Sequence, residues 1–194
     1  MNLFYYPGAC SLADHIALIE TGLAHRLISI KYDRTTEDGR DFLSINPKGY
    51  IPTLELEDGT VLTENQVILN YIAEKSGKLL PKDGIIRWRA LEALAFMSSE
   101  IHSRYLPFFR NFSEMEKERA REKLAQAFAI LAGQMGEKTF LVSDEMTIAD
   151  CYLFWVLMVA PRSGVELPEA LGRFLAYMRT LPSVTQALAE EGLG

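Results

Sequence analysis

The sequence predicts a small α/β domain followed by an all-helical domain, and three observations support this. Over the first 76 residues, short strand-like and helix-like segments alternate. From residue 85 onward nearly every segment has a helical period. Residues 77–84 contain two Gly, one Pro and three charged residues, a composition typical of a linker. We therefore expect one domain at residues 1–76 and a second at 85–194.

In the first domain the expected order is β-α-β-α and then β-β-α. Strands are expected at residues 3–6, 27–31, 53–56 and 60–62. Helices are expected at 11–21, at 38–44 and after Thr63. Ser11 and Asp14 have the spacing of a capping box, and Gly22 is placed to end the first helix. Glu57-Asp58-Gly59 between two strands is typical of a β-hairpin.

The second domain is expected to consist of helices alone. A long helix covers residues 85–105, with Leu94, Met97 and Ile101 on its core face. Capping boxes at 113–116 and 147–150 open two more helices, and a last helix is expected at 169–179. The longest unbroken apolar run covers ten residues, 151–160. A membrane-spanning helix needs about 20, so this run predicts a buried core helix.

Composition excludes several classes of protein. Apolar residues make up 48% of the 194 residues and charged residues 24%, the balance of a globular chain and not of a disordered one. A net charge of −6 argues against general binding to nucleic acid or anionic membranes. The two Cys are far apart and no secretory signal is visible, so we expect a cytoplasmic protein without disulfides. The three His show no ligand spacing, and no metal is expected.

Cys10 is the first candidate for chemistry. It lies between the Pro7-Gly8 turn and the expected helix start at Ser11. Unpaired N–H groups at a helix N-terminus favour a thiolate, so we expect the pKa of Cys10 to be lowered. A lone Cys is more often a small buried apolar residue, but the loop setting favours the reactive interpretation. Position 13 is Ala, which excludes a Cys-x-x-Cys redox cycle. Cys151 is expected in the core.

Two further segments each have an ordinary and a functional interpretation. Ile51-Pro52 precedes a strand, and most X–Pro bonds are trans, whereas a cis bond would turn the Ile51 backbone toward an extended peptide. The helix that starts near Glu64 and Asn65 offers N–H groups suited to a carboxylate, and these two side chains add groups for an amino-acid zwitterion. For this second segment, a plain capping box between Thr63 and Gln66 is the interpretation that the residues alone favour.

The helix at 85–105 has a second face that indicates a groove. Small and hydroxylated residues line it, and His102 follows them with Tyr105 one turn later. His102 titrates near neutrality and suits an anionic ligand, although a surface His or one bonded to Ser98 is the simpler interpretation. Glu100 and Arg104 have the spacing of a solvated ion pair.

Together these motifs resemble bacterial beta-class glutathione transferases over essentially the whole chain. The segments that carry the resemblance are Tyr5-Tyr6-Pro7-Gly8-Ala9-Cys10-Ser11, Asn46-Pro47-Lys48-Gly49-Tyr50-Ile51-Pro52, Leu62-Thr63-Glu64, Ser99-Glu100-Ile101-His102 and Thr147-Ile148-Ala149-Asp150-Cys151-Tyr152-Leu153-Phe154. The resemblance implies a thioredoxin-like N-terminal domain, a C-terminal helical bundle and a two-fold homodimer. It also implies that glutathione is a co-substrate bound at the domain junction.

In the first domain the resemblance implies a glutathione-binding role for five residues. Cys10 would contact the glutathione sulfur and be able to form a mixed disulfide with it. Ile51, before a cis Pro52, would pair with the cysteinyl backbone of glutathione. Glu64 and the position of Asn65 would hold the γ-glutamyl end.

In the second domain the resemblance implies a catalytic role for His102, which with Ser99 and Glu100 would position the thiolate. Thr147 and Asp150 would form a folding box. The expected wall against the electrophile is Tyr105, Phe109 and Trp155, chosen by position and apolarity.

The implied function is transfer of the glutathione thiolate to small apolar electrophiles, a detoxification activity. The chain departs from the family pattern at Asn65, Ala93, Ala95 and Ser103, and Arg34 stands near the position of a Lys that binds the glycyl carboxylate. Two alternatives therefore stay open. One is glutathione-dependent disulfide or peroxide reduction through Cys10, and the other is a non-catalytic interaction module on the same fold.

Overall fold

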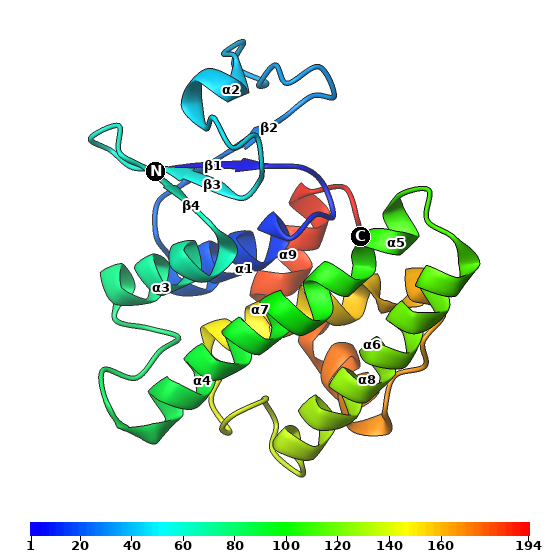
Figure 1. Cartoon of the computed structure of the whole chain (residues 1–194). Helices are drawn as coiled ribbons and strands as arrows, with labels where there is room; N and C mark the ends of the chain where they lie inside the picture. Colours follow the sequence, from blue (N-terminus) through cyan, green and yellow to red (C-terminus); the bar gives the residue numbers. More distant parts are fainter. The chain divides into compact units, whose positions relative to one another are not determined.

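The computed structural model describes residues 1–194 and separates into two compact units (Figure 1). Residues 1–80 and 181–194 form the first unit, and residues 81–180 form the second. The sequence analysis assigns residues 181–194 to the second domain, whereas in the structure they pack with the N-terminal residues in the first unit. None of the helices combines the length and apolarity that a membrane crossing requires.

The first unit is built on a four-stranded mixed sheet in the order β2-β1-β3-β4. Its strands are β1 (Asn2–Tyr5), β2 (Arg26–Ser29), β3 (Thr53–Glu55) and β4 (Val61–Thr63). β1 pairs parallel with β2 and antiparallel with β3, so that Leu3 faces Leu27 on one side and Leu54 on the other. β3 and β4 form the expected hairpin. All four expected strands are confirmed to within two residues.

Three helices cover one side of this sheet and a short one covers the other (Figure 1). The three are α1 (Ser11–Thr21), α3 (Asn65–Ser76) and α9 (Pro182–Glu190), and α1 packs against both others. On the other side α2 (Phe42–Ile45) packs Phe42 on Phe4 and Ile28. α2 is shorter than expected because residues 36–40 form a turn, in which the Arg40 N–H donates to Thr36 Oγ1 at 2.9 Å.

The capping box expected at Ser11 is not formed. Cys10 already has helical backbone angles and is the N-cap of α1, without a side-chain cap bond. Asp14 is therefore the fourth helical residue and not the third, so it cannot reach back to the N-cap. At the other end Gly22 adopts φ 74° and ends the helix as expected.

The second unit is helical throughout, as expected. Its longer helices are α4 (Gly84–Phe96), α6 (Glu114–Met135), α7 (Ile148–Val159) and α8 (Glu169–Met178). Its short segments are the π-helical η1 (Met97–Ile101), the 3₁₀-helical η2 (His102–Tyr105), α5 (Leu106–Phe109) and the 3₁₀-helical η3 (Ala160–Ser163). The single helix expected at 85–105 is thus interrupted where its backbone changes to π and then 3₁₀ geometry. Such interruptions frequently occur at functional sites.

Both capping boxes predicted in this unit are confirmed. Ser113 and Glu116 exchange bonds at the start of α6, and Thr147 and Asp150 do so at the start of α7. The buried Asp150 carboxylate accepts from the Thr147 N–H at 2.7 Å, from Thr147 Oγ1 at 2.9 Å and from the Leu141 N–H at 2.8 Å. Burial nevertheless raises the pKa of Asp150 to about 6, because desolvation outweighs these bonds. Cys151 is fully buried, as expected.

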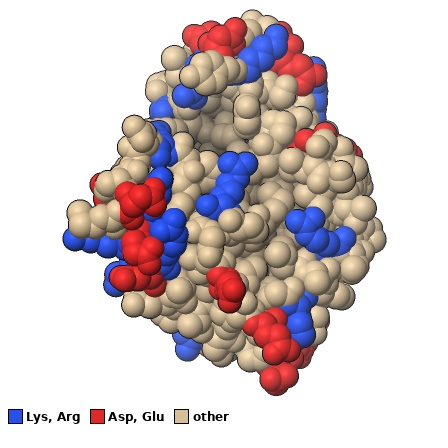
Figure 2. All heavy atoms as spheres, turned by 90° about the vertical axis from the view of Figure 1, so that its right-hand side faces the viewer, with Lys and Arg blue, Asp and Glu red and all other residues tan.

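Charged side chains are mixed on the face shown in Figure 2, where Lys and Arg alternate with Asp and Glu in small groups. That face carries no large area of a single sign. With a net charge of −6, the chain as a whole does not attract anions, so positive groups that could pair with an anion are local ones.

Candidate functional site

Cys10 lies where three segments of the first unit meet. Its Sγ donates to the Ile51 carbonyl oxygen at 3.5 Å. The Asn65 side-chain amide, in the first turn of α3, donates to the Cys10 carbonyl oxygen at 2.8 Å. The Ile51–Pro52 bond is cis, as the family resemblance implied. The loop before α1, the turn before β3 and the start of α3 are thus bonded to one another around a single thiol.

The expected lowering of the Cys10 pKa is wrong. Cys10 is only 8% exposed, and burial raises the pKa of its thiol to about 12. Electrostatic repulsion by Asp14, whose own pKa burial raises well above its ordinary value, raises the Cys10 pKa further, and hydrogen bonding from Asn65 and from the backbone lowers it by less. The helix N-terminus therefore does not decide the direction in which the pKa of Cys10 shifts. Without a ligand, Cys10 is a thiol.

The capping box expected at the start of α3 is not formed. No capping box joins Thr63 and Gln66, and the N-cap Glu64 makes no side-chain cap bond. Glu64 instead has φ 70°, which is unusual outside glycine and concentrates at functional sites. Lys48 Nζ donates to Glu64 Oε1 at 2.7 Å and to Thr63 Oγ1 at 2.9 Å. The sequence analysis missed this role of Lys48, because the contact joins residues 16 positions apart.

A cavity of about 500 Å³ lies beside Cys10 in the same unit. Ala9 and Ile51 form the wall nearest to Cys10, and Lys31 and Arg34 supply two cations. Arg34 has φ 71° and donates from Nη1 to the Gly49 carbonyl oxygen. The volume is within the usual range for small-molecule sites. The cavity is therefore an apolar hollow with local positive charge, next to a thiol.

His102, in the second unit, is held by aromatic neighbours. Its Nδ1 lies 2.7 Å from the Tyr152 hydroxyl, and its ring centroid lies 4.5 Å from that of Trp155. The hydrogen-bond partner of His102 is thus Tyr152, and not Ser98 as the simpler interpretation of the sequence expected. Burial lowers the pKa of His102 below its ordinary value, so the ring is a neutral imidazole at neutral pH.

The other expected residues of the second unit make local contacts. Ser99 Oγ donates to the Phe96 carbonyl oxygen at 3.5 Å. The Glu100 carboxylate accepts from Arg104 at 3.3 Å, which confirms the expected ion pair. Both ion-pair side chains are more than 40% exposed, so their pairing contributes little to stability.

Of the three expected wall residues, Tyr105 does not fit that role. It is 1% exposed and its hydroxyl donates to the Val156 carbonyl oxygen at 2.7 Å, so it belongs to the core. Tyr105 was chosen for its position and apolarity, which do not show whether its side chain points into the core. Phe109 is 50% exposed and lies under the Arg162 guanidinium. Trp155 is 4% exposed and stacks on Tyr152.

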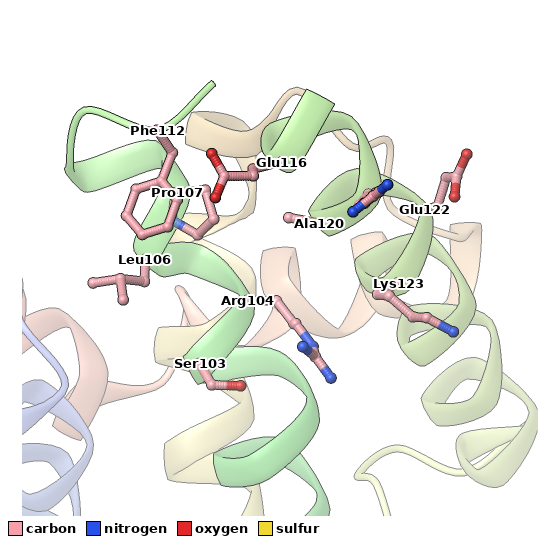
Figure 3. Close-up of a pocket in the computed structure, with 10 residues that line it drawn as sticks. Ser103, Arg104, Leu106, Pro107, Phe112, Glu116, Ala120, Glu122 and Lys123 are labelled. Carbon is pink, nitrogen blue, oxygen red and sulfur yellow. The ribbon is translucent and has the colours of Figure 1, made fainter. Parts of the chain in front are cut away.

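A separate cavity of about 400 Å³ opens within the second unit between α6 and the segment from η2 to α5 (Figure 3). In Figure 3, Leu106, Pro107 and Phe112 cluster at one end of it, while Arg104 and Lys123 extend toward the other. Its hydroxyl residue, Ser103, donates to the Ser99 carbonyl oxygen. None of the residues expected to bind glutathione lines this cavity.

A thioredoxin-like unit with a lone Cys at the start of its first helix, joined to an all-helical unit, defines a two-domain transferase fold. Comparison with known proteins agrees. The model of the glutathione S-transferase N-terminal domain matches residues 9–75, and that of the C-terminal domain matches 92–183. Glutathione S-transferase GstA of Escherichia coli O157:H7 is 36% identical, with 100% of both chains covered.

Two solved structures also match this chain along its whole length. A sphingomonad glutathione S-transferase complexed with glutathione is 37% identical, with a TM-score of 0.94 and 100% of both chains covered. The bacterial beta-class enzyme of Sphingomonas chungbukensis is 38% identical, with a TM-score of 0.93 and the same coverage. The chain belongs to the glutathione S-transferase family. The family, the fold and the enzyme class expected from the sequence are thereby confirmed.

Proposed function

We propose that this protein conjugates the thiolate of glutathione to small electrophilic compounds, and that its first unit binds the peptide around Cys10. The observation that carries this is the bonded set of Cys10, Ile51 and Asn65 described above. It brings a thiol, the backbone of the half-buried Ile51 and a helix start to one place. The sphingomonad relative, which is described as complexed with glutathione, supports the choice of peptide.

The start of α3 suits the γ-glutamyl end of glutathione. The helix has 12 residues, and the N–H groups of its first turn favour a carboxylate. Glu64 supplies an acceptor for the α-amino group, and Lys48 fixes the Glu64 side chain. Asn65 already donates to Cys10, so it acts by holding the two segments together and not as a free ligand.

The glycyl end would enter the cavity beside Ala9 and Ile51. Lys31 and Arg34 line this cavity, and either cation pairs with a carboxylate. Ile51 pairs with the cysteinyl backbone from the middle of the site. Together with α3, these groups account for both charged ends and the centre of the tripeptide.

Catalysis requires the glutathione thiol to ionise, because the thiolate is the nucleophile. Favouring the anion by two pKa units supplies about 2.7 kcal/mol. Cys10 in its thiol form can donate one hydrogen bond to the glutathione sulfur. The second proposed catalytic residue is His102, and Ser99 and Glu100 are near it in the chain. Phe109 and Trp155 are proposed to contact the electrophile.

A homodimer is part of the proposal, because it is typical of the family that the sequence resembles. The reductase alternative requires a Cys10 thiolate, which the raised pKa of Cys10 disfavours. Conjugation by bound glutathione is therefore the better supported activity.

Glutathione binding and the Cys10→Ala variant test this function. Wild type should be retained on glutathione-agarose, bind glutathione in calorimetry and conjugate it to an activated aryl chloride. Conjugation should survive in Cys10→Ala, whereas any mixed-disulfide reduction should disappear. Absence of binding at millimolar glutathione would favour the non-catalytic interaction module instead.

A further inference from the structure

The cavity beside Ala9 and Ile51 is lined by two cationic residues and by no acidic one. Lys31 and Arg34 are its charged lining residues, and the others are uncharged. The chain as a whole carries a net charge of −6, and the cavity between α6 and the segment from η2 to α5 has two Glu in its lining as well as three cations. A concave site whose only charges are positive favours an anionic ligand.

The four carboxylates in the segment between β2 and α2 are bonded outside this cavity. Asp33 accepts from the Thr35 N–H, Glu37 from Ser29, Asp38 from Arg40 and Asp41 from the Leu43 N–H. None of the four lines the cavity. Lys31 is exposed, and its side chain forms no hydrogen bond or ion pair with the chain. Its ammonium group is therefore available to a ligand.

Arg34 is placed for the glycyl carboxylate of glutathione. Its Nη1 donates to the Gly49 carbonyl oxygen, two residues before Ile51, which pairs with the cysteinyl backbone in the proposed function. A guanidinium has five N–H donors, so this bond leaves others for a carboxylate. Glutathione brings one carboxylate to this end of the site, whereas the cavity offers two cations. Lys31 is therefore left for a charge on the second reactant.

Two exposed Tyr side chains also line this cavity. β1 and β2 run parallel, and just beyond them the Ile30 N–H donates to the Tyr5 carbonyl oxygen at 3.0 Å. Tyr6, which follows β1, and Tyr32, which follows β2, therefore come to the same edge of the sheet. Tyr6 is 54% exposed and Tyr32 is 100% exposed, so both rings are accessible to a ligand. Such rings pack well against another aromatic ring, in offset or edge-to-face contact.

We propose that this cavity selects aromatic electrophiles that carry a carboxylate. Tyr6 and Tyr32 contact the aromatic ring, and Lys31 pairs with the carboxylate. This selectivity rests on the proposed function, and it narrows the substrate from small electrophiles in general to anionic aromatic ones. All the residues that carry it belong to the first unit.

The reaction with a chlorinated member of this class can be written in full. The thiol proton of glutathione goes to water, and the thiolate sulfur attacks the ring carbon that carries chlorine. A C–S bond forms, the C–Cl bond breaks, and chloride leaves with the bonding electron pair. Lys31 takes no part in these bond changes, because it holds the carboxylate elsewhere on the ring.

A matched pair of electrophiles tests the role of Lys31. A chlorodinitrobenzoate and the corresponding uncharged carboxamide have the same ring and leaving group, and each kcat/KM is divided by the rate constant of the uncatalysed reaction. At saturating glutathione, wild type should prefer the benzoate. Lys31→Met should lower this preference roughly fivefold, as expected for one partly exposed ion pair. Because the preference is a ratio, any effect on glutathione binding cancels.

Two further variants serve as controls for charge. Arg34→Met should weaken glutathione binding and leave the preference as in wild type, because Arg34 is assigned to the glycyl carboxylate. Lys75→Met removes an exposed cation from α3 that does not line the cavity, and it should change neither quantity. A loss of preference in Lys75→Met equal to that in Lys31→Met would show an effect of net charge and overturn the proposal.

Tyr32 provides a separate test of the aromatic contact. Its side chain is fully exposed, so Tyr32→Ala should fold like wild type. The KM of both aromatic electrophiles should rise about threefold in Tyr32→Ala, with the KM of glutathione unchanged. Tyr32→Phe keeps the ring and should match wild type.

A wild type that conjugates both compounds without preference would overturn the anionic selectivity and leave the proposed function standing. So would a Lys31→Met variant with the wild-type preference. A wild type that conjugates neither compound and does not bind glutathione would overturn the proposed function and this inference with it. The two failures are therefore distinguishable in one set of assays.

Discussion

The Glu191 carboxylate accepts a hydrogen bond from the Gly8 backbone N–H at 2.9 Å, across 183 positions of sequence. Its second oxygen lies 3.0 Å from His15 Nδ1, while His15 Nε2 lies 2.9 Å from a Glu190 carboxylate oxygen. Gly8 has φ 73°, and a Cβ there would contact the Leu193 side chain. The last residues of the chain therefore hold the turn that precedes Cys10, within the first unit.

Replacing Glu191 by Ala should destabilise the protein strongly. The change removes the carboxylate that accepts from the Gly8 N–H and contacts the fully buried His15 ring, and breaking a buried pair costs about 3–5 kcal/mol. Urea unfolding measures this loss. Glu190→Ala is the matched control, because its carboxylate contacts the same His ring but is 41% exposed, and its loss should be about 1 kcal/mol or less. Equal losses in the two variants would contradict a special role for Glu191.

Asp150 should make stability fall as pH rises from about 4 to about 6. Its folded pKa of about 6 is above the unfolded value near 4, so the folded state binds the proton more tightly. Its contribution is fully present below pH 4 and is lost as the pH passes through the folded pKa. The difference of about two units corresponds to about 3 kcal/mol. Asp150→Asn removes this titration, so unfolding at pH 4 and 7 should show a flatter dependence than in wild type. Parallel curves would show that Asp150 titrates alike in both states.

Local signals predicted the helix starts at Ser113 and Thr147, because in both cases an acidic residue three positions later completes a capping box. The same logic failed at Ser11, because Cys10 already adopts helical backbone angles and shifts the box by one position. The sequence analysis places the last helix at 169–179, but a further helix, α9, begins at Pro182, because Pro is favoured at the first helical position. Tertiary packing, and not the local sequence pattern, decides where these helices begin.

The candidate site was predictable in its composition and not in its electrostatics. Cys10, Ile51 and Asn65 are identified by motif, and they meet in the structure. The sign of the Cys10 pKa shift is set mainly by burial, which the local sequence does not show. Lys48 is likewise recognisable as part of a motif, but its bond to Glu64 exists only after the loop and the helix are brought together.

The lowered pKa of His102 predicts a neutral ring at working pH. Its NMR titration midpoint should lie below the ordinary value of about 6.5. Because the folded pKa is below the unfolded one, the contribution of His102 to stability is present above about pH 6.5 and is lost as the pH falls through the folded value. Between pH 7 and 5 wild type should therefore lose more stability than His102→Gln in urea unfolding. A titration midpoint above 6.5 would contradict this assignment.

Lys48 should affect glutathione binding more than it affects folding. Its ion pair with Glu64 joins side chains that are 53% and 65% exposed, so Lys48→Met should lower the free energy of unfolding by less than about 1 kcal/mol. The same change frees Glu64 and removes a cation from the start of α3, where we propose that the γ-glutamyl end binds. We expect the glutathione Kd to rise roughly fivefold in calorimetry. Arg89→Met is the matched control, because the Arg89–Glu92 pair is similarly exposed, at 59% and 54%, and lies in the helical unit. If both variants weaken binding equally, or neither does, Lys48 does not support the γ-glutamyl site. A selective loss in Lys48→Met, with unfolding unchanged, would tie the start of α3 to the ligand and not merely to the fold.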